Sequence, residues 1–133
     1  SNDKEKIYAN IDALVSFSSI EGLPTVILES IAHGKPVLYT DCSSGPRELM
    51  LPESDPLIKT SSYEKTSIGY LVKPVLGSSA CSDFLSPYEE EYLDILERFV
   101  SDVKEKKFSM KYNSALFSEA VVVDKWMKII DGL

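Results

Sequence analysis

The sequence contains few of the residue types that metal centres and redox sites require. It holds two cysteines, Cys42 and Cys81, and a single histidine, His33. The cysteines lie far apart and form no C-x-x-C pair, so a zinc site is not expected, and reduced thiols are the favoured state. No apolar run approaches the roughly 18–20 residues that cross a bilayer. We also expect no signal peptide, because no apolar segment follows the polar residues 1–6.

Basic residues are outnumbered. The 133 residues include 14 Lys and Arg against 21 Asp and Glu, a formal net charge of −7. A nucleic-acid or anionic-membrane surface is therefore not expected, because phosphates require clustered Lys and Arg. Hydrophobic residues make up 44% and charged residues 26% of the chain, which is typical of one globular domain with a core of its own.

The apolar residues occur in short continuous runs. Residues 13–17, 36–40 and 68–72 read as strands. Helices are predicted over 3–10, 25–33, 47–51 and 87–107, followed by one or two amphipathic helices, whereas 52–67 and 77–83 read as turns and loops. Buried strands alternating with helices predict an α/β fold, a Rossmann-like three-layer unit with a short parallel sheet of about three strands. We assign residues 1–133 to one partial domain, with C-terminal helices in 87–133.

Two carboxylates mark the segment with the most chemical content. Glu21 lies in the loop after the first strand, and Glu29 lies in the next helix. A helix N-terminus attracts phosphate, and ionised carboxylates accept hydrogen bonds from hydroxyl groups. A nucleoside diphosphate sugar offers both kinds of group. Taken alone, however, two such acids are more often simply solvated.

The residues around the two acids carry a resemblance. Residues 21–37 read E-G-L-P-T-V-I-L-E-S-I-A-H-G-K-P-V, which resembles the signature of glycosyltransferase family 4, the group 1 retaining glycosyltransferases of the GT-B fold. Residues 41–48, D-C-S-S-G-P-R-E, resemble a variant found in bacterial members that build surface polysaccharides. Residues 69–72, G-Y-L-V, resemble the strand that follows.

The resemblance implies a role for each matching residue. Glu21 would be the catalytic acid that faces the donor sugar, and Glu29 would hold the ribose hydroxyls. The remaining donor-binding residues would be Gly22, Leu23, Pro24, Thr25, Val26, Gly45 and Glu48. The substrate would be a nucleotide-diphosphate sugar, with a UDP-sugar favoured. No metal and no other cofactor is expected.

The chain departs from the family pattern by what it does not contain. The G-R…K-G stretch that neutralises the diphosphate and the acceptor-binding N-terminal domain are both missing, so the chain resembles the back half of a C-terminal donor-binding domain. We expect it to be inactive alone. The full-length protein would be a cytoplasmic enzyme, or one peripheral to the inner membrane face, acting on a saccharide or lipid-linked saccharide. The alternative is a non-catalytic interaction module. A dinucleotide-dependent oxidoreductase ranks low, because no G-x-G-x-x-G follows a strand.

Several further residues carry structural predictions. The strand over 13–17 is expected at a bare sheet edge, where it would pair with another copy or another polypeptide. Trp126 is predicted to anchor the last helix in the core. Cys42 reads as a small packed residue, and a salt bridge or solvent is favoured for Arg47 over a phosphate. We expect a structural or solvent role for His33.

Overall fold

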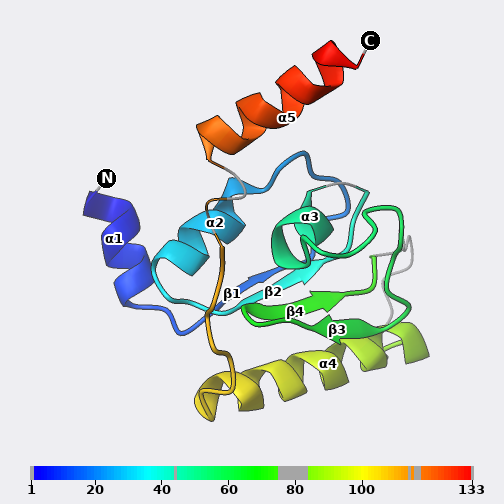
Figure 1. Ribbon diagram of the computed structural model, residues 1–133. Coiled ribbons are helices and arrows are strands. Elements are labelled where there is room, and N and C mark those ends of the chain that lie inside the picture. Colours follow the sequence, from blue (N-terminus) through cyan, green and yellow to red (C-terminus); the bar gives the residue numbers. More distant parts are fainter. Residues whose placement is uncertain (1, 44, 75–83, 114, 116–117, 133) are drawn as a thin grey trace.

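The computed structural model of the chain describes residues 2–43, 45–74, 84–113, 115 and 118–132 (Figure 1). Within these residues the elements follow one another as α1 (Asn2–Ala9), β1 (Leu14–Ser16), α2 (Thr25–Ala32), β2 (Val37–Thr40), α3 (Pro46–Met50), β3 (Tyr63–Lys65), β4 (Gly69–Val72), α4 (Pro87–Lys104) and α5 (Glu119–Asp131). The helices and strands predicted from the sequence are present, with small shifts at their ends. The predicted loop over 77–83, including Cys81, lies outside the described residues.

The strands form one sheet in the order β1-β2-β4-β3. β1 pairs with β2, and β2 with β4, in parallel, as the continuous apolar runs predicted. All four residues of both β2 and β4 are buried. The prediction of about three strands was one short. β3 runs antiparallel to β4 and lies within residues 52–67, which were expected to hold only turns. Its three residues, Tyr-Glu-Lys, carry no apolar run, and pairing with β4 defines the strand.

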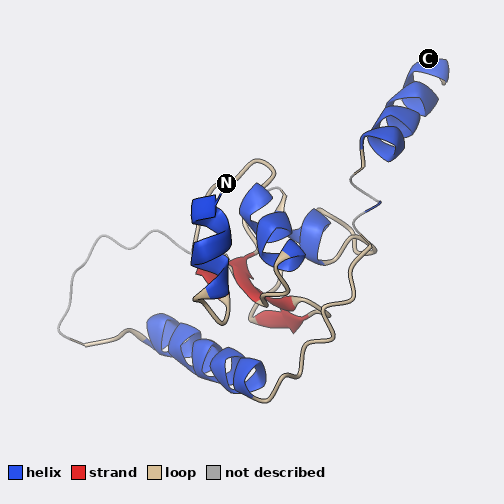
Figure 2. Cartoon of the chain, turned by 90° about the vertical axis from the view of Figure 1, so that its left-hand side faces the viewer, coloured by secondary structure: helices blue, strands red, loops and turns tan. Residues whose placement is uncertain are grey.

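Helices cover both faces of the sheet, which confirms the three-layer prediction. α2 and α3 lie on one face and α4 on the other (Figures 1 and 2). Successive residues of β2 point to opposite faces of the sheet and pack into two separate hydrophobic clusters. Val37 and Tyr39 pack with Ile27 of α2, whereas Leu38 packs with Phe99 of α4. This alternation follows from the two-residue period of a strand.

Local sequence signals set the helix ends. Gly34 follows α2 with φ +68, a left-handed conformation that suits glycine. A capping box forms at the start of α4. Ser86 Oγ accepts a bond of 3.2 Å from the Glu89 amide, and the Glu89 carboxylate accepts one of 2.7 Å from the Ser86 amide. No helix in the described part of the chain is long and apolar enough to cross a membrane.

The prediction for Trp126 was wrong. α5 lies apart from the sheet (Figures 1 and 2), and the Trp126 side chain is 62% exposed. Met127, Ile129 and Ile130 of the same helix are exposed as well. The helix is amphipathic as expected, but its apolar side meets no core among the described residues.

Candidate functional site

The candidate site lies beyond the carboxyl ends of β1 and β2. Residues 17–24 leave β1 and lead into α2, and residues 41–45 leave β2 and lead into α3. Thr40 Oγ1 donates a hydrogen bond to the Ser18 carbonyl, which joins the two chain segments where they leave the sheet. In an open parallel sheet, ligands bind beyond the carboxyl ends of the strands.

Gly45 brings the two loops into direct contact. Its backbone has φ +91, and a Cβ placed on it would lie 1.9 Å from the Gly22 carbonyl oxygen and 2.7 Å from Pro24 Cδ. Only glycine fits such an approach without displacing backbone. Gly45 and Gly22 thus lie side by side where these two loops meet. Gly22 itself is exposed, with open space beside its Cα.

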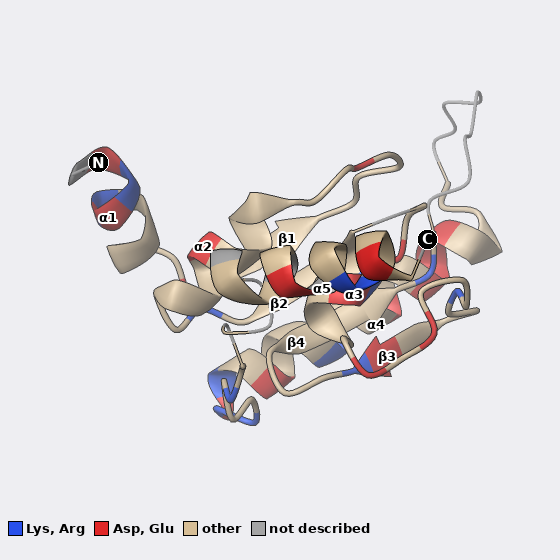
Figure 3. Cartoon of the chain, turned by 45° about the horizontal axis from the view of Figure 1, so that its top comes forward, with Lys and Arg blue, Asp and Glu red and all other residues tan. Residues whose placement is uncertain are grey.

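Glu21 is held by the central strand. The buried Tyr39 hydroxyl of β2 donates a bond of 2.8 Å to Glu21 Oε1. This bond, together with one involving Ser18, keeps the pKa of Glu21 below its usual value. The side chain is therefore ionised at neutral pH, and a carboxylate is a hydrogen-bond acceptor only. Residues 17–24 contain this one acid and neither Lys nor Arg, so the ribbon between β1 and α2 carries no blue in Figure 3.

Glu29 engages a different element. It lies in the second turn of α2, and Lys4 of α1 donates to its carboxylate at 2.8 Å. The Glu29 side chain is 33% exposed. The two acids of the motif thus have different neighbours: Glu21 is fixed by strand β2 and Glu29 by helix α1. Sequence reasoning missed both partners, since nothing in the spacing links Lys4 or Tyr39 to these acids.

The mouth of α2 offers backbone donors. Pro24 precedes the helix, and no described side chain caps it. The first-turn amides of Thr25 and Val26 therefore remain for a ligand or water, whereas Pro24 has no amide hydrogen to give. Thr25 and Leu23 are exposed and Val26 is half-buried, so part of this mouth faces solvent.

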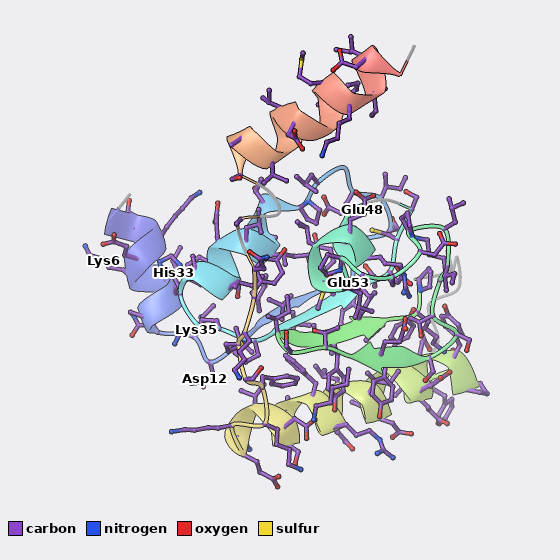
Figure 4. The ribbon with its side chains drawn as sticks, in the orientation of Figure 1. Lys6, Asp12, His33, Lys35, Glu48 and Glu53 are labelled. Carbon is purple, nitrogen blue, oxygen red and sulfur yellow. The ribbon has the colours of Figure 1, made fainter. Side chains whose placement is uncertain are left out.

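The second loop and α3 hold both exposed and buried side chains. Glu48 lies on the exposed side of α3 (Figure 4). Arg47 is buried against Asp41, which confirms the salt bridge favoured over a phosphate contact. Cys42 is 2% exposed and packed, as expected, and burial raises the pKa of its thiol. His33 stacks on Tyr8 of α1 with the ring centroids 4.4 Å apart, which is a structural role.

A cavity of about 610 Å³ lies elsewhere, between the edge strand β1 and helix α4. Its walls include Val15, Pro36, Phe99 and Val103, but neither Glu21 nor Glu29 nor any of the predicted donor-binding residues. Among the described residues, no three His, Cys, Asp or Glu side chains are grouped so that they could hold a metal ion. The groups that the motif presents are two carboxylates, Glu21 and Glu29, and the first-turn amides of α2.

Comparisons with known proteins agree on one family. A family model described as "Glycosyl transferases group 1" matches residues 1–69. The chain is 28% identical over 123 residues to a protein of Methanocaldococcus jannaschii named as an uncharacterized glycosyltransferase, covering 87% of the chain and 30% of that protein. It is 29% identical over 110 residues to the lipopolysaccharide 1,6-galactosyltransferase of Salmonella typhimurium, covering 83% of the chain and 28% of that protein.

A third relative matches over a shorter stretch. The lipopolysaccharide 1,6-galactosyltransferase of Escherichia coli is 40% identical over 43 residues, covering 32% of the chain and 12% of that protein. The chain thus spans less than a third of the length of these curated relatives. No solved structure matches it significantly.

Proposed function

The chain belongs to the group 1 glycosyl transferases, and on that premise we propose that it is the donor-binding part of a retaining enzyme of family 4. The enzyme would transfer a sugar from a nucleoside diphosphate sugar to an acceptor. The observation that carries this proposal is the contact of Gly45 with Gly22. It presses two strand-end loops together beside an ionised Glu21 and an uncapped helix mouth.

Each part of this arrangement suits one part of the donor. The diphosphate would lie at the mouth of α2, where the amides of residues 25 and 26 and the helix dipole favour negative charge. The donor sugar would offer hydroxyls to Glu21, which is held as an acceptor by Tyr39. Leu23 and Gly22 would line the sugar, and Glu48 would face the donor from α3. UDP is our choice for the nucleotide, and no metal is needed in this scheme.

Glu29 would bind the ribose diol in place of Lys4. The Lys4–Glu29 pair is exposed, and exposed ion pairs contribute only about 0–1 kcal/mol. Two ribose hydroxyls could therefore displace the lysine at little cost. The first helix would then act as a weak competitor for the ribose site.

The acceptor belongs to the rest of the enzyme. Two relatives are named for galactosyl transfer to lipopolysaccharide, which supports a saccharide or lipid-linked saccharide acceptor in bacterial surface polysaccharide synthesis. We propose a cytoplasmic or inner-face location accordingly. Transfer requires an oriented acceptor and exclusion of water. The 133 residues alone would bind donor without turnover.

An NMR titration with UDP tests the proposal. The Gly22 and Gly45 amides of the ¹⁵N-labelled chain should shift at millimolar UDP, and Glu29→Gln should weaken binding by about tenfold, the cost of one lost charge-assisted bond. Glu97→Gln, on the exposed side of α4, is the matched control and should bind like wild type. No shift at either glycine, or equal binding by the Glu29 variant, would contradict the proposal.

A second candidate is a non-catalytic interaction module. The observation in its favour is the open sheet edge at β1 together with the exposed apolar side of α5. We propose that residues 13–17 pair with another polypeptide at this edge, in the first instance a second copy of the chain. A chain that associates but gives no UDP response at Gly22 would favour this reading.

A further inference from the structure

A buried ion pair closes the loop that carries Gly45. Asp41 follows β2 directly and Arg47 lies in the first turn of α3, and their side chains are 0% and 2% exposed. Arg47 Nη2 donates to Asp41 Oδ2 at 2.6 Å, and Arg47 Nε donates to the same oxygen at 3.1 Å. The pair thus ties together the two ends of the loop.

Other segments fix the Asp41 carboxylate and its neighbour. The Thr60 amide donates to Asp41 Oδ2 at 2.8 Å. Lys59 Nζ donates to the Cys42 carbonyl at 2.7 Å and lies 3.5 Å from Asp41 Oδ1. These bonds come from the irregular stretch before β3, so this stretch is anchored on the start of the loop.

The guanidinium of Arg47 is held equally well. It also donates to the Glu64 carboxylate of β3 and, through Nη1, to Ser54 Oγ at 3.3 Å. Strand β3, which the sequence did not predict, therefore has a specific use: it fixes the far side of the arginine. Both members of the pair are satisfied on several sides, as buried charges must be.

The pair is more important for the geometry that it fixes than for its contribution to the stability of the fold. A buried ion pair seldom stabilises a fold more than apolar residues of the same volume would. The planar fork of an arginine does, however, fix direction as well as distance, which lysine does not. Between the two ends of this loop, Gly45 packs so closely against the Gly22 carbonyl that a Cβ would not fit. A small shift of Arg47 would therefore move Gly45 relative to the Gly22 loop.

We propose that the Asp41–Arg47 pair is a positioning device that holds the Gly45 loop against the Gly22 loop and so sets the geometry of the donor site. Neither side chain touches the donor in this scheme. The inference rests on the proposed function and adds residues to it that the resemblance did not assign. It explains why a charged network is buried directly behind a site that must be rigid to within about an ångström.

Cys42 provides a reporter of the loop. It lies between Asp41 and Gly45 in the chain and is almost fully buried, so a thiol reagent reaches it only when the loop opens. In a Cys81→Ser background it is the sole thiol. Arg47→Lys should speed its labelling and weaken UDP binding by about tenfold or more, because the cation remains and the fork is lost. Glu64→Gln, at a more exposed position, should do both to a smaller degree and tests the idea if the first variant does not fold.

Asp102→Asn is the control. Asp102 accepts a bond of 2.6 Å from Tyr70 on the α4 side of the sheet, so the variant should lower stability without changing Cys42 labelling or UDP binding. Faster labelling with wild-type UDP binding in the Arg47 and Glu64 variants would overturn the inference. Weaker UDP binding by Asp102→Asn, when its melting temperature is lowered no more than that of Arg47→Lys, would overturn it as well. If wild type itself gives no UDP shifts, the proposed function fails; if wild type binds and the variants bind equally, only this inference fails.

Discussion

The buried Tyr39 hydroxyl donates a 2.8 Å hydrogen bond to Glu21, so the central strand of the sheet holds the acid of the candidate site. The bond favours the ionised carboxylate and lowers the pKa of Glu21. Tyr39→Phe removes the donor and should raise that pKa toward its usual value, as measured by NMR titration of the Glu21 carboxyl carbon. Tyr63→Phe, on the α4 side of the sheet, should leave the Glu21 pKa unchanged.

The sign of the stability effect follows from the same shift. A carboxyl with a lowered folded pKa stabilises the fold above its unfolded pKa, and this contribution is lost as the pH falls through the folded pKa. The difference in unfolding free energy between wild type and Tyr39→Phe should therefore shrink between about pH 5 and pH 3. A constant difference over this range would show that the bond does not depend on the charge of Glu21.

Gly45 and Gly34 provide a matched pair of glycines. Both have positive φ, but a Cβ at Gly34 would meet nothing within 4 Å, whereas a Cβ at Gly45 would overlap the Gly22 carbonyl. Gly34→Ala should cost about 1–2 kcal/mol in unfolding free energy, the penalty of the left-handed conformation alone. Gly45→Ala should cost about 3 kcal/mol or more, because backbone must also move. Equal costs in urea denaturation would show that the two loops are not in contact.

Lys4 tests whether helix α1 competes for the ribose site. Lys4→Ala should change the unfolding free energy by less than about 0.5 kcal/mol, because the Lys4–Glu29 pair is exposed. UDP affinity should stay the same or rise, since Glu29 is freed. Calorimetric titration of both proteins with UDP makes the comparison. Weaker binding by the variant would mean that Lys4 contacts the nucleotide itself.

The strong periodic signals of the sequence predicted the fold, and the weak ones did not. Continuous apolar runs identified β1, β2 and β4, and the helix predicted over 87–107 is present as α4. β3 was not predicted, because its three residues include one aromatic and are too few to show an alternating pattern. The strand is defined by its pairing with β4, which depends on the tertiary structure. The amphipathic pattern of α5 was correct, but such a pattern identifies an apolar side of a helix and not what covers it.

In the candidate site, too, some features could be predicted from the sequence and others could not. The loops, the acids and the glycines stand at spacings that the sequence displays, whereas the contact of Gly45 with Gly22 is seen only in the structure. The partners Tyr39 and Lys4 are set by packing between segments far apart in the chain. Residue spacing carries no information about such contacts, so they were found only in the structure.

The edge of the sheet predicts association. β1 pairs only with β2 within the described residues, and Val15 is 43% exposed beside the cavity under α4. Sedimentation velocity should show a larger species as concentration rises, because an unpaired apolar strand is a template for pairing. Val15→Lys should abolish this species, whereas Leu57→Lys, at an exposed apolar residue away from the edge, should not. A wild-type chain that remains monomeric at high concentration would refute association at this edge.

Trp126 reports directly on the environment of α5. As the only tryptophan of the chain, it gives the whole indole signal, and its side chain is 62% exposed. Its fluorescence should therefore have the emission maximum of a solvated indole and be quenched efficiently by acrylamide. Trp126→Phe should leave the unfolding free energy within about 0.5 kcal/mol of wild type, since an exposed ring contributes little to the core. A blue-shifted, protected emission that turns red in urea would show instead that the apolar side of α5 is packed in the folded chain.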